Sequence, residues 1–575
     1  MKSDITSSLF ERKPWIEILA VNVFYCSIFI AFTFPFVFHL TDSIIGRNDA
    51  LQFAWNSFNF EQSLIAGNVF FTQTMFHPWG AGTLMHAGGL LTNIIALPFS
   101  NKVFVINIIL VVHFILSGTG AYRLSRHLGL GTVYALIAGF IFAFSPYKMA
   151  RLAEHQNLVM TGFVPYFIVF YLRSFDFFKY KFFPKIISYR FLILAAGVGF
   201  LQALTDFVVM FHLLYFATFW ILFAYIYRYR QQYGTATMVI TLLGTSFFLH
   251  FLSNSLVQIG ANDSGGLWWG GYWADFVRPD SARFYSGSVG EMLRSVFARY
   301  NMGIEGQAFV GYSLLLMFAI AVARWSKRQS PLYMSAMLFA IMCILLVSIP
   351  EPTGYQSIYS PFAFLHFVPG LTELRCPERI FSLAYLCIAV FGLYQFQTIM
   401  SATSKAVQNI ALLGFFSVLF LEYYPNPYPI TSSVNVPNTV VALRCKPARA
   451  VLAYPFGLRD GYRQDGHYEM MHAIYQMQHT KHQLGGYISR LDAGLRQKYL
   501  SNDFIRDLII MQDGTDSLLP AKNYSSYIDE LDFESAMILQ QDFSAQGAVF
   551  LDSVLFANGY TRQSCGDGIL LLKHH

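Results

Sequence analysis

Long apolar stretches recur along the chain, and short polar segments separate them. Each stretch is close to the roughly 17–25 residues that a helix needs to cross a bilayer. The first is longer than the apolar core of a signal peptide and has no small-residue cleavage pattern behind it, so it is expected to remain as a helix. The pattern predicts about eleven membrane-spanning helices, near residues 16–38, 103–122, 130–146, 158–173, 190–205, 207–227, 236–257, 307–323, 332–349, 380–399 and 407–422.

One apolar stretch, GLLTNIIALPFS at residues 89–100, does not fit this series. It is too short to span and ends in Pro-Phe-Ser, so we expect it to be re-entrant or to lie at the membrane surface. If it did span, the orientation of every later helix would be inverted.

The composition agrees with a membrane protein. Hydrophobic residues make up 55% of the 575 residues and charged residues only 13%, too few to cover a water-exposed surface. The net charge of +6 is spread along the chain rather than gathered in a basic tract. We therefore predict a polytopic α-helical protein in the lipid bilayer and no nucleic-acid partner.

Lys and Arg indicate the orientation. They are denser in the short connections 123–129, 173–190 and 324–331 and in the first 15 residues than in the long loops. By the positive-inside rule the N-terminus is cytoplasmic, and the loops 39–102, 258–306 and 350–379 lie outside. We divide the chain into a membrane domain, 1–422, and an outer domain, 423–575.

The outer domain differs in pattern, because polar and apolar residues alternate and prolines punctuate its start. VLAYPF and GILLLKHH are typical of strands and HYEMMHAIYQMQH of a helix, which predicts a small soluble α/β domain. Cys445 and Cys565 lie where a disulfide could form, with Cys376 as a third candidate, but their spacing establishes no pairing.

Carboxylates, arginines, histidines and tryptophans gather in the outer loops, whereas the inner connections are short and basic. A carboxylate can deprotonate an acceptor, arginine forks bind phosphate, and indole rings stack on sugars. Such a set suits a donor whose phosphate lies at headgroup level and whose tail lies in the bilayer. The spacing of these residues specifies no reaction.

The order of these residues resembles a known family. The first outer loop holds Asp49, then Trp55, then His77-Pro78-Trp79-Gly80. This order is similar to that in the first outer loop of the GT-C superfamily of integral-membrane glycosyltransferases, and mainly to that of its bacterial members. Later stretches of the chain are also similar to members of this group. They are SPYKMARLAEHQNL, DFVRPDSARFY, EGQAFVGYSLL, FVPGLTELRCPERIFSL and, in the tail, VLAYPFGLRDGYRQDGHYEMMHAIYQMQHTKHQLGGYISR.

The resemblance implies transfer of a hexose or pentose from an undecaprenyl- or decaprenyl-phosphate carrier, with inversion at the anomeric carbon. It implies that Asp49 is the catalytic base, and Asp42 is the rival. Asn48 stands where many relatives have a second acid, so no metal site is predicted, although a divalent metal stays open. Asp49 could instead pair with Arg47 or cap the helix that follows.

The other site residues are predicted from the same loops. Lys148, Arg151 and His155 share one helical face by spacing, which could line the site or be solvated. Arg375 and Arg379 could be neutralised by their neighbours Glu373 and Glu378. His77 and His86 make a weak metal pair, and the Trp-rich segment that ends at Trp273 could simply anchor at the interface. Asp206 is expected at a solvated hairpin tip. We assign donor-phosphate binding to Arg278, Arg375, Arg379, Lys148 and Arg151, and acceptor or sugar binding to Trp55, His77, His155, Trp273 and Glu305.

The sequence therefore predicts a glycosyltransferase of the bacterial inner membrane whose acceptor is an extracytoplasmic glycan, lipid or protein such as a pilin. The alternative is a non-catalytic polysaccharide assembly factor or a flippase or transporter of lipid-linked glycans. A secondary transporter is less favoured, because the predicted spans hold few ionisable residues and no internal repeat is visible.

Overall fold

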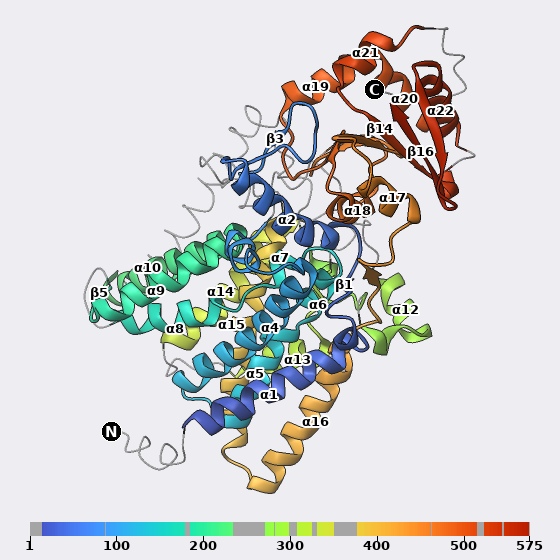
Figure 1. The fold of residues 1–575 in the computed structure, drawn as a ribbon. Helices are drawn as coiled ribbons and strands as arrows, with labels where there is room; N and C mark the ends of the chain where they lie inside the picture. Colours follow the sequence, from blue (N-terminus) through green and yellow to red (C-terminus); the bar gives the residue numbers. More distant parts are fainter. Residues whose placement is uncertain are drawn as a thin grey trace. The chain divides into compact units, whose positions relative to one another are not determined.

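The computed structural model describes residues 14–84, 86, 88–178, 184–233, 271–280, 282–297, 307–324, 331–349, 376–461, 463–514, 522–542 and 545–573. The chain forms two compact units (Figure 1). We call residues 1–37 and 109–428 the helical unit, and residues 38–108 and 429–575 the loop–tail unit. The first long loop therefore belongs to the same unit as the C-terminal tail, which was not anticipated from the sequence.

Helices dominate the helical unit, as the apolar stretches predict. Phe140 and Phe144 of α5 are fully buried and pack against Phe32 of α1, with ring centroids 5.9 and 5.6 Å apart. The main helices are α1 (Pro14–Thr33), α4 (Lys102–His127, which starts in the loop–tail unit), α5 (Thr132–Phe144), α6 (Pro146–Leu152), α7 (Gln156–Val159), α8 (Val164–Ser174), α9 (Tyr189–Thr205), α10 (Phe207–Tyr233), α12 (Ser288–Val296), α13 (Tyr312–Ala323), α14 (Pro331–Val347), α15 (Phe381–Met400) and α16 (Lys405–Tyr423).

Among the described residues, six helices are long and apolar enough to cross a membrane. They fall in the predicted stretches at 16–38, 103–122, 130–146, 207–227, 380–399 and 407–422, so a multi-pass membrane protein is supported by length and composition. The predicted span 236–257 lies outside the described residues, and α8, α9, α13 and α14 are shorter. The count of about eleven stays a prediction. Residues 89–100 hold only the seven-residue α3 (Leu90–Ala96), which is too short to span.

A five-stranded sheet organises the tail, in the order β12-β9-β14-β16-β15. β9 (Ala450–Ala453) pairs in parallel with β12 (His482–Gln483) and β14 (Ser535–Leu539), and β16 (Gly568–Lys573) pairs antiparallel with β14 and β15 (Tyr560–Ser564). The two predicted strands and the predicted helix, now α18 (Met471–His479), are confirmed.

The sheet is covered on both faces. Ala450 and Leu452 of β9 belong to one apolar cluster, and Val451 and Ala453 belong to another, as expected from alternating side chains. All four residues are buried, which is typical of a central strand. The surrounding helices are α17 (Asn438–Arg444), α18, α19 (Ala493–Ser501), α20 (Asp503–Gln512), α21 (Ser525–Glu530) and α22 (Gln546–Ala557).

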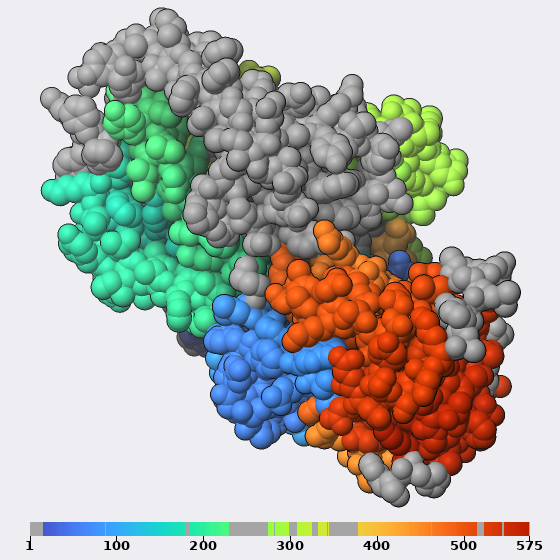
Figure 2. Space-filling view, turned by 90° about the horizontal axis from the view of Figure 1, so that it is seen from above, coloured from blue at the N-terminus to red at the C-terminus, as the bar shows by residue number. Residues whose placement is uncertain are grey.

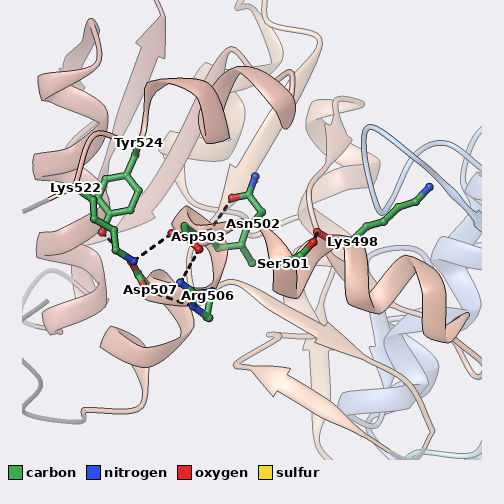
Figure 3. Close-up of polar contacts among 9 residues, drawn as sticks. Lys498, Ser501, Asn502, Asp503, Arg506, Asp507, Lys522 and Tyr524 are labelled. Carbon is green, nitrogen blue, oxygen red and sulfur yellow. Dashed lines mark hydrogen bonds and ion pairs between the residues drawn. The ribbon is translucent and has the colours of Figure 1, made fainter. Parts of the chain in front are cut away.

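A buried carboxylate ties α20 to the segment after it (Figure 3). Asp507, which is 2% exposed, accepts hydrogen bonds from Lys522 Nζ and Tyr524 Oη, each at 2.9 Å. Asn502 caps the same helix by accepting from the backbone N–H of Ile505. The ion pairs drawn in Figure 3 therefore join α20 to the segment that precedes α21.

The first long loop packs into the core of the tail. Leu51, Trp55, Met75 and Phe76 lie in the same buried cluster as Leu452 of the sheet. β1 (Ser43–Ile45) pairs antiparallel with β8 (Ile430–Ser432), which joins the start of the loop to the start of the tail. Figure 2 shows the blue loop residues directly against the orange and red tail. Residues far apart in sequence thus share one hydrophobic core.

The His-Pro-Trp-Gly element forms a tight turn in this loop, between β2 (Phe71–Thr72) and β3 (Ala81–Gly82). The backbone N–H of Gly80 donates to Phe76 O at 2.8 Å, and Gly80 has a positive φ of 69°. A Cβ at this position would lie 2.5 Å from Thr72 O, so only glycine fits without a shift.

Cys445 and Cys565 of the loop–tail unit are not joined by a disulfide, and Cys376 belongs to the helical unit.

Candidate functional site

Asp49 lies in a 3-10 turn, Asn48–Leu51, just before α2 (Gln52–Ile65). The N-terminal cap of this turn is Arg47, and α2 begins at Gln52, so Asp49 does not cap the following helix. Its carboxylate accepts from Arg459 Nη2 at 3.4 Å through Oδ1 and from Tyr487 Oη at 3.3 Å through Oδ2. The side chain is 14% exposed. The carboxylate is therefore held at both oxygens and keeps a small exposed area.

Two neighbouring strands of the tail deliver these partners. Arg459 ends β10 (Gly457–Arg459) and Tyr487 ends β13 (Gly486–Tyr487); the strands are parallel, and the two residues are register partners. The Arg459 guanidinium lies over the Tyr487 ring, 4.9 Å from its centroid, a cation–π arrangement. β11 (Gln464–Gly466) completes this three-stranded sheet.

Tyr487 packs against a buried histidine, His86. The His86 ring is 6.2 Å from that of Tyr487 and 6.0 Å from that of Trp55, both edge to face. The backbone N–H of Ser489 donates to His86 Nδ1 at 3.0 Å, which leaves the ring proton on Nε2, where it donates to Asn56 Oδ1 at 2.8 Å. Burial lowers the pKa of His86 to about 4, so it is neutral near pH 7.

Trp55 is a core residue in this structure. It is 1% exposed, and its indole N–H donates to Gln476 Oε1 at 2.5 Å. Gln476 lies on α18 of the tail. Trp55 therefore joins the loop to the tail, and its ring face is not open to solvent.

Asp42, the rival base, lies in a different setting. Its carboxylate accepts from Ser43 Oγ at 2.7 Å and is 3.4 Å from His39 Nδ1, so these partners are sequence neighbours. Its side chain is 41% exposed. The tail contacts Asp42 through its backbone carbonyl, which accepts from Ser433, whereas it contacts Asp49 through the carboxylate.

His77 is buried, and its hydrogen-bond partners differ from Arg459 and Tyr487, the partners of Asp49. Its Nε2 hydrogen-bonds Asp532 O at 2.8 Å, and its own carbonyl accepts from Tyr499 Oη at 2.5 Å. Burial, more than its neighbours, lowers the pKa of this imidazole. The structure places His77 at the junction of the loop with the tail.

Lys148 and Arg151 of α6 are fully buried in the helical unit. Lys148 Nζ donates to Thr161 Oγ1 at 2.9 Å and to Ser117 Oγ at 3.2 Å. Arg151 Nη1 donates to Gln307 O at 3.0 Å, and Nη2 is 4.0 Å from a carboxylate oxygen of buried Glu378. Neither cation is solvated.

The spacing predicts that Lys148, Arg151 and His155 share one face of a single helix, and this prediction is wrong. The helix ends at Leu152, and His155 is the N-terminal cap residue of α7. The backbone N–H of His155 donates to Arg151 O at 2.7 Å, which closes the turn between the two helices.

Other predicted site residues are scattered over the helical unit. Arg278 donates to Asp280 at 2.8 Å and to Phe297 O at 3.3 Å, and Arg379, half-buried, lies in the turn Pro377–Ile380 before α15. Trp273 begins a short turn, Trp273–Phe276. Arg375 and Glu305 lie outside the described residues, as does Glu373.

Asp206 is not a solvated tip, so that expectation is also wrong. It is 7% exposed and accepts from Asn157 Nδ2 at 2.6 Å and from the backbone N–H of Val209 at 2.8 Å. It caps α10 and binds the α7 segment, which hydropathy alone could not reveal.

Within the described part of the chain, no group of three or more His, Cys, Asp or Glu side chains is placed to hold a metal ion.

The sequence indicates Asp49 but does not reveal that Arg459, Tyr487 and His86 surround it. Arg459 and Tyr487 lie in the tail stretch that resembles the GT-C group, but that resemblance indicates no role for either residue. The signals for these residues in the sequence are an arginine at the end of a short buried strand and a Gly-Gly-Tyr segment. Neither signal shows that Arg459 and Tyr487 lie side by side, because that depends on the register of the two strands.

Comparisons with solved structures return 18 matching chains. One is the archaeal oligosaccharyltransferase AglB from Archaeoglobus fulgidus in complex with an inhibitory peptide and a dolichol-phosphate, with 13% identity, a TM-score of 0.48, and coverage of 99% of this chain and 75% of that chain. The apo Archaeoglobus fulgidus oligosaccharyltransferase shows 11% identity, a TM-score of 0.46 and coverage of 99% and 75%. Its complex with Zn and sulfate shows 10% identity, a TM-score of 0.47 and coverage of 97% and 73%. No family model and no curated protein matches this chain. Similarity of this size establishes no activity for the chain.

Proposed function

We propose that this chain is a membrane-bound glycosyltransferase that moves a sugar from a polyprenyl-phosphate donor to an acceptor outside the cytoplasm, with Asp49 as general base. The observation that carries the proposal is the Asp49 carboxylate, which is partly exposed and held by Arg459 and Tyr487. A general base must be reachable and must have a fixed direction. The resemblance of Asp49, Trp55 and the His-Pro-Trp-Gly element to the GT-C first loop supports the same residue.

In the proposed reaction, Asp49 takes the proton of the acceptor's attacking group. The acceptor atom forms a bond to the anomeric carbon while the bond from that carbon to the phosphate oxygen breaks. The electron pair stays on the polyprenyl phosphate, which is already ionised, so no general acid is required. The configuration at the anomeric carbon is inverted.

Donor-phosphate binding by the cations of the helical unit stays a prediction. Arg278 and Arg379 are partly exposed, which favours them over the buried Lys148 and Arg151. An arginine fork suits phosphate oxygens because it can donate two parallel hydrogen bonds. The carrier would be undecaprenyl or decaprenyl phosphate, and the acceptor a glycan, a lipid or a protein such as a pilin.

We also propose a bacterial inner-membrane location, with the N-terminus cytoplasmic and the loop–tail unit outside. The alternative is a non-catalytic assembly factor or a flippase for lipid-linked glycans. The test compares cells that lack the protein with cells that carry the wild type, Asp49→Asn or Asp42→Asn, by mass spectrometry of extracytoplasmic glycans, glycolipids and glycoproteins. We expect a sugar modification with the wild type and Asp42→Asn but not with Asp49→Asn at equal protein level. A modification that persists with Asp49→Asn favours the alternative.

A further inference from the structure

The partners of Asp49 come from the tail, although the proposed base lies in the first long loop. From this geometry we infer that Arg459 and Tyr487 are positioning residues for Asp49, so that the C-terminal tail completes the proposed active site. The inference rests on the proposed function, because it concerns the base of that reaction. Neither residue was assigned a role by the sequence.

The first reason is that the two contacts act on different oxygens. Arg459 donates to Oδ1 and Tyr487 to Oδ2, so together they restrain rotation of the carboxylate about its last side-chain bond. A carboxylate whose orientation is fixed is already aligned with the acceptor proton. Misplacement of the base by about 1 Å can cost on the order of 100-fold in rate.

The second reason is that the pair is itself rigid. Arg459 and Tyr487 are register partners on parallel strands, and the guanidinium is stacked on the phenol ring. Tyr487 is 6% exposed and its ring meets the edge of buried His86, which is fixed through both ring nitrogens. The Asp49 contacts therefore come from side chains that have little freedom of their own.

A glycine places Tyr487 in this position. Gly486 has a φ of 140°, in the region that side chains rarely adopt. A Cβ there would lie 2.7 Å from Met75 Sδ of the first loop, so a larger residue would require Met75 to shift. The close approach brings the tail strand against the loop that carries Asp49.

The competing explanation is that Arg459 and Tyr487 merely attach the loop to the tail. Two features argue against it. The Arg459 side chain is 29% exposed, so its ion pair with Asp49 adds little net stability. The shared core around Trp55 and Met75 already joins loop and tail.

The experiment measures kcat and KM of purified full-length variants in proteoliposomes that contain a polyprenyl-phosphate sugar, with the acceptor identified in the cells as substrate. The variants are Arg459→Met, Arg459→Lys and Tyr487→Phe. We expect kcat to fall about 100-fold for Arg459→Met and about 10-fold for Tyr487→Phe, with KM for the donor unchanged within about twofold. Arg459→Lys keeps the charge and is expected to recover part of the loss.

Matched controls come from the same unit. Arg562 is ion-paired to Asp552 at 2.6 Å, and its guanidinium lies over the Phe556 ring, 4.8 Å from the centroid. Arg459 makes the same two kinds of contact, an ion pair and a cation–π contact. Tyr524 donates to Asp507 as Tyr487 donates to Asp49. Arg562→Met and Tyr524→Phe should keep wild-type kcat. Size-exclusion profiles and melting temperatures establish that all variants are folded.

The outcomes separate the two proposals. If Asp49→Asn keeps transfer, the proposed function fails, and the positioning role fails with it. If Asp49→Asn abolishes transfer but Arg459→Met and Tyr487→Phe keep wild-type kcat, only the positioning role is overturned. A loss of kcat that Arg562→Met and Tyr524→Phe share to the same extent also overturns it.

Discussion

The Arg459 guanidinium lies 3.4 Å from the Asp49 carboxylate although 410 positions separate the two residues in the sequence. The contact is possible because the first long loop and the tail fold as one unit with a common core. In consequence, the chemistry proposed for the loop depends on residues near the opposite end of the chain.

Replacement of Trp55 by phenylalanine should destabilise the loop–tail unit by about 1–3 kcal/mol, because the buried Gln476 Oε1 loses its indole donor. Thermal unfolding of the purified protein measures the change. Trp79→Phe is the control, since Trp79 packs edge to face on Tyr499 and phenylalanine keeps a ring there. An equal shift for both variants would contradict the structural role of the Trp55 hydrogen bond.

The loop–tail unit should lose stability in acid. His86 is neutral when folded, because burial lowers its pKa from the ordinary 6.5 to about 4. Between these values the unfolded chain binds more protons, so the free energy of unfolding falls as pH decreases from about 6.5 to 4. The loss from His86 alone approaches about 3 kcal/mol at the lower end.

The measurement is the melting temperature between pH 7 and pH 4 for the wild type and His86→Gln. The variant should be less stable at pH 7 but should show a weaker pH dependence, and exposed His467→Gln should behave as the wild type. An unchanged pH dependence in His86→Gln would refute this origin of the acid sensitivity.

Arg151→Met should destabilise the helical unit by about 3–5 kcal/mol, because it leaves the buried Glu378 carboxylate without the nearby guanidinium. The double variant Arg151→Met, Glu378→Gln should recover part of this loss, since no buried charge is left behind. Melting temperatures in detergent measure both. No recovery in the double variant would argue against the ion pair as the cause.

Gly486→Ala should destabilise the loop–tail unit by about 1–3 kcal/mol, because alanine is strained at a φ of 140° and its methyl group meets Met75. Gly82→Ala is the control, since a methyl group there meets no atom within 4 Å. The two melting temperatures should differ clearly, and equal values would contradict the close approach.

Much of the fold was predictable because it follows from local patterns. Apolar stretches placed the long helices, and short runs of apolar residues placed β9 and β16. The common core of loop and tail was not predictable, since it depends on packing between segments such as Trp55 and Gln476 that lie 421 positions apart.

The buried polar groups of the helical unit show a second limit. Lys148, Arg151 and Asp206 stand at or near helix ends, where polarity suggests solvent, yet all three are buried. Their hydrogen bonds to Thr161, Gln307 and Asn157 come from elsewhere in the chain. Sequence polarity identified these residues as notable but could not supply their partners.

The central claim is that Asp49 is the base for glycosyl transfer, and the most direct measurement is transfer from a polyprenyl-phosphate sugar by purified Asp49→Asn in proteoliposomes. Asparagine has nearly the same shape but cannot take the proton. We predict a loss of at least about 100-fold in kcat, with an unchanged melting temperature and with Asp42→Asn at wild-type activity. Wild-type transfer by Asp49→Asn would contradict the claim.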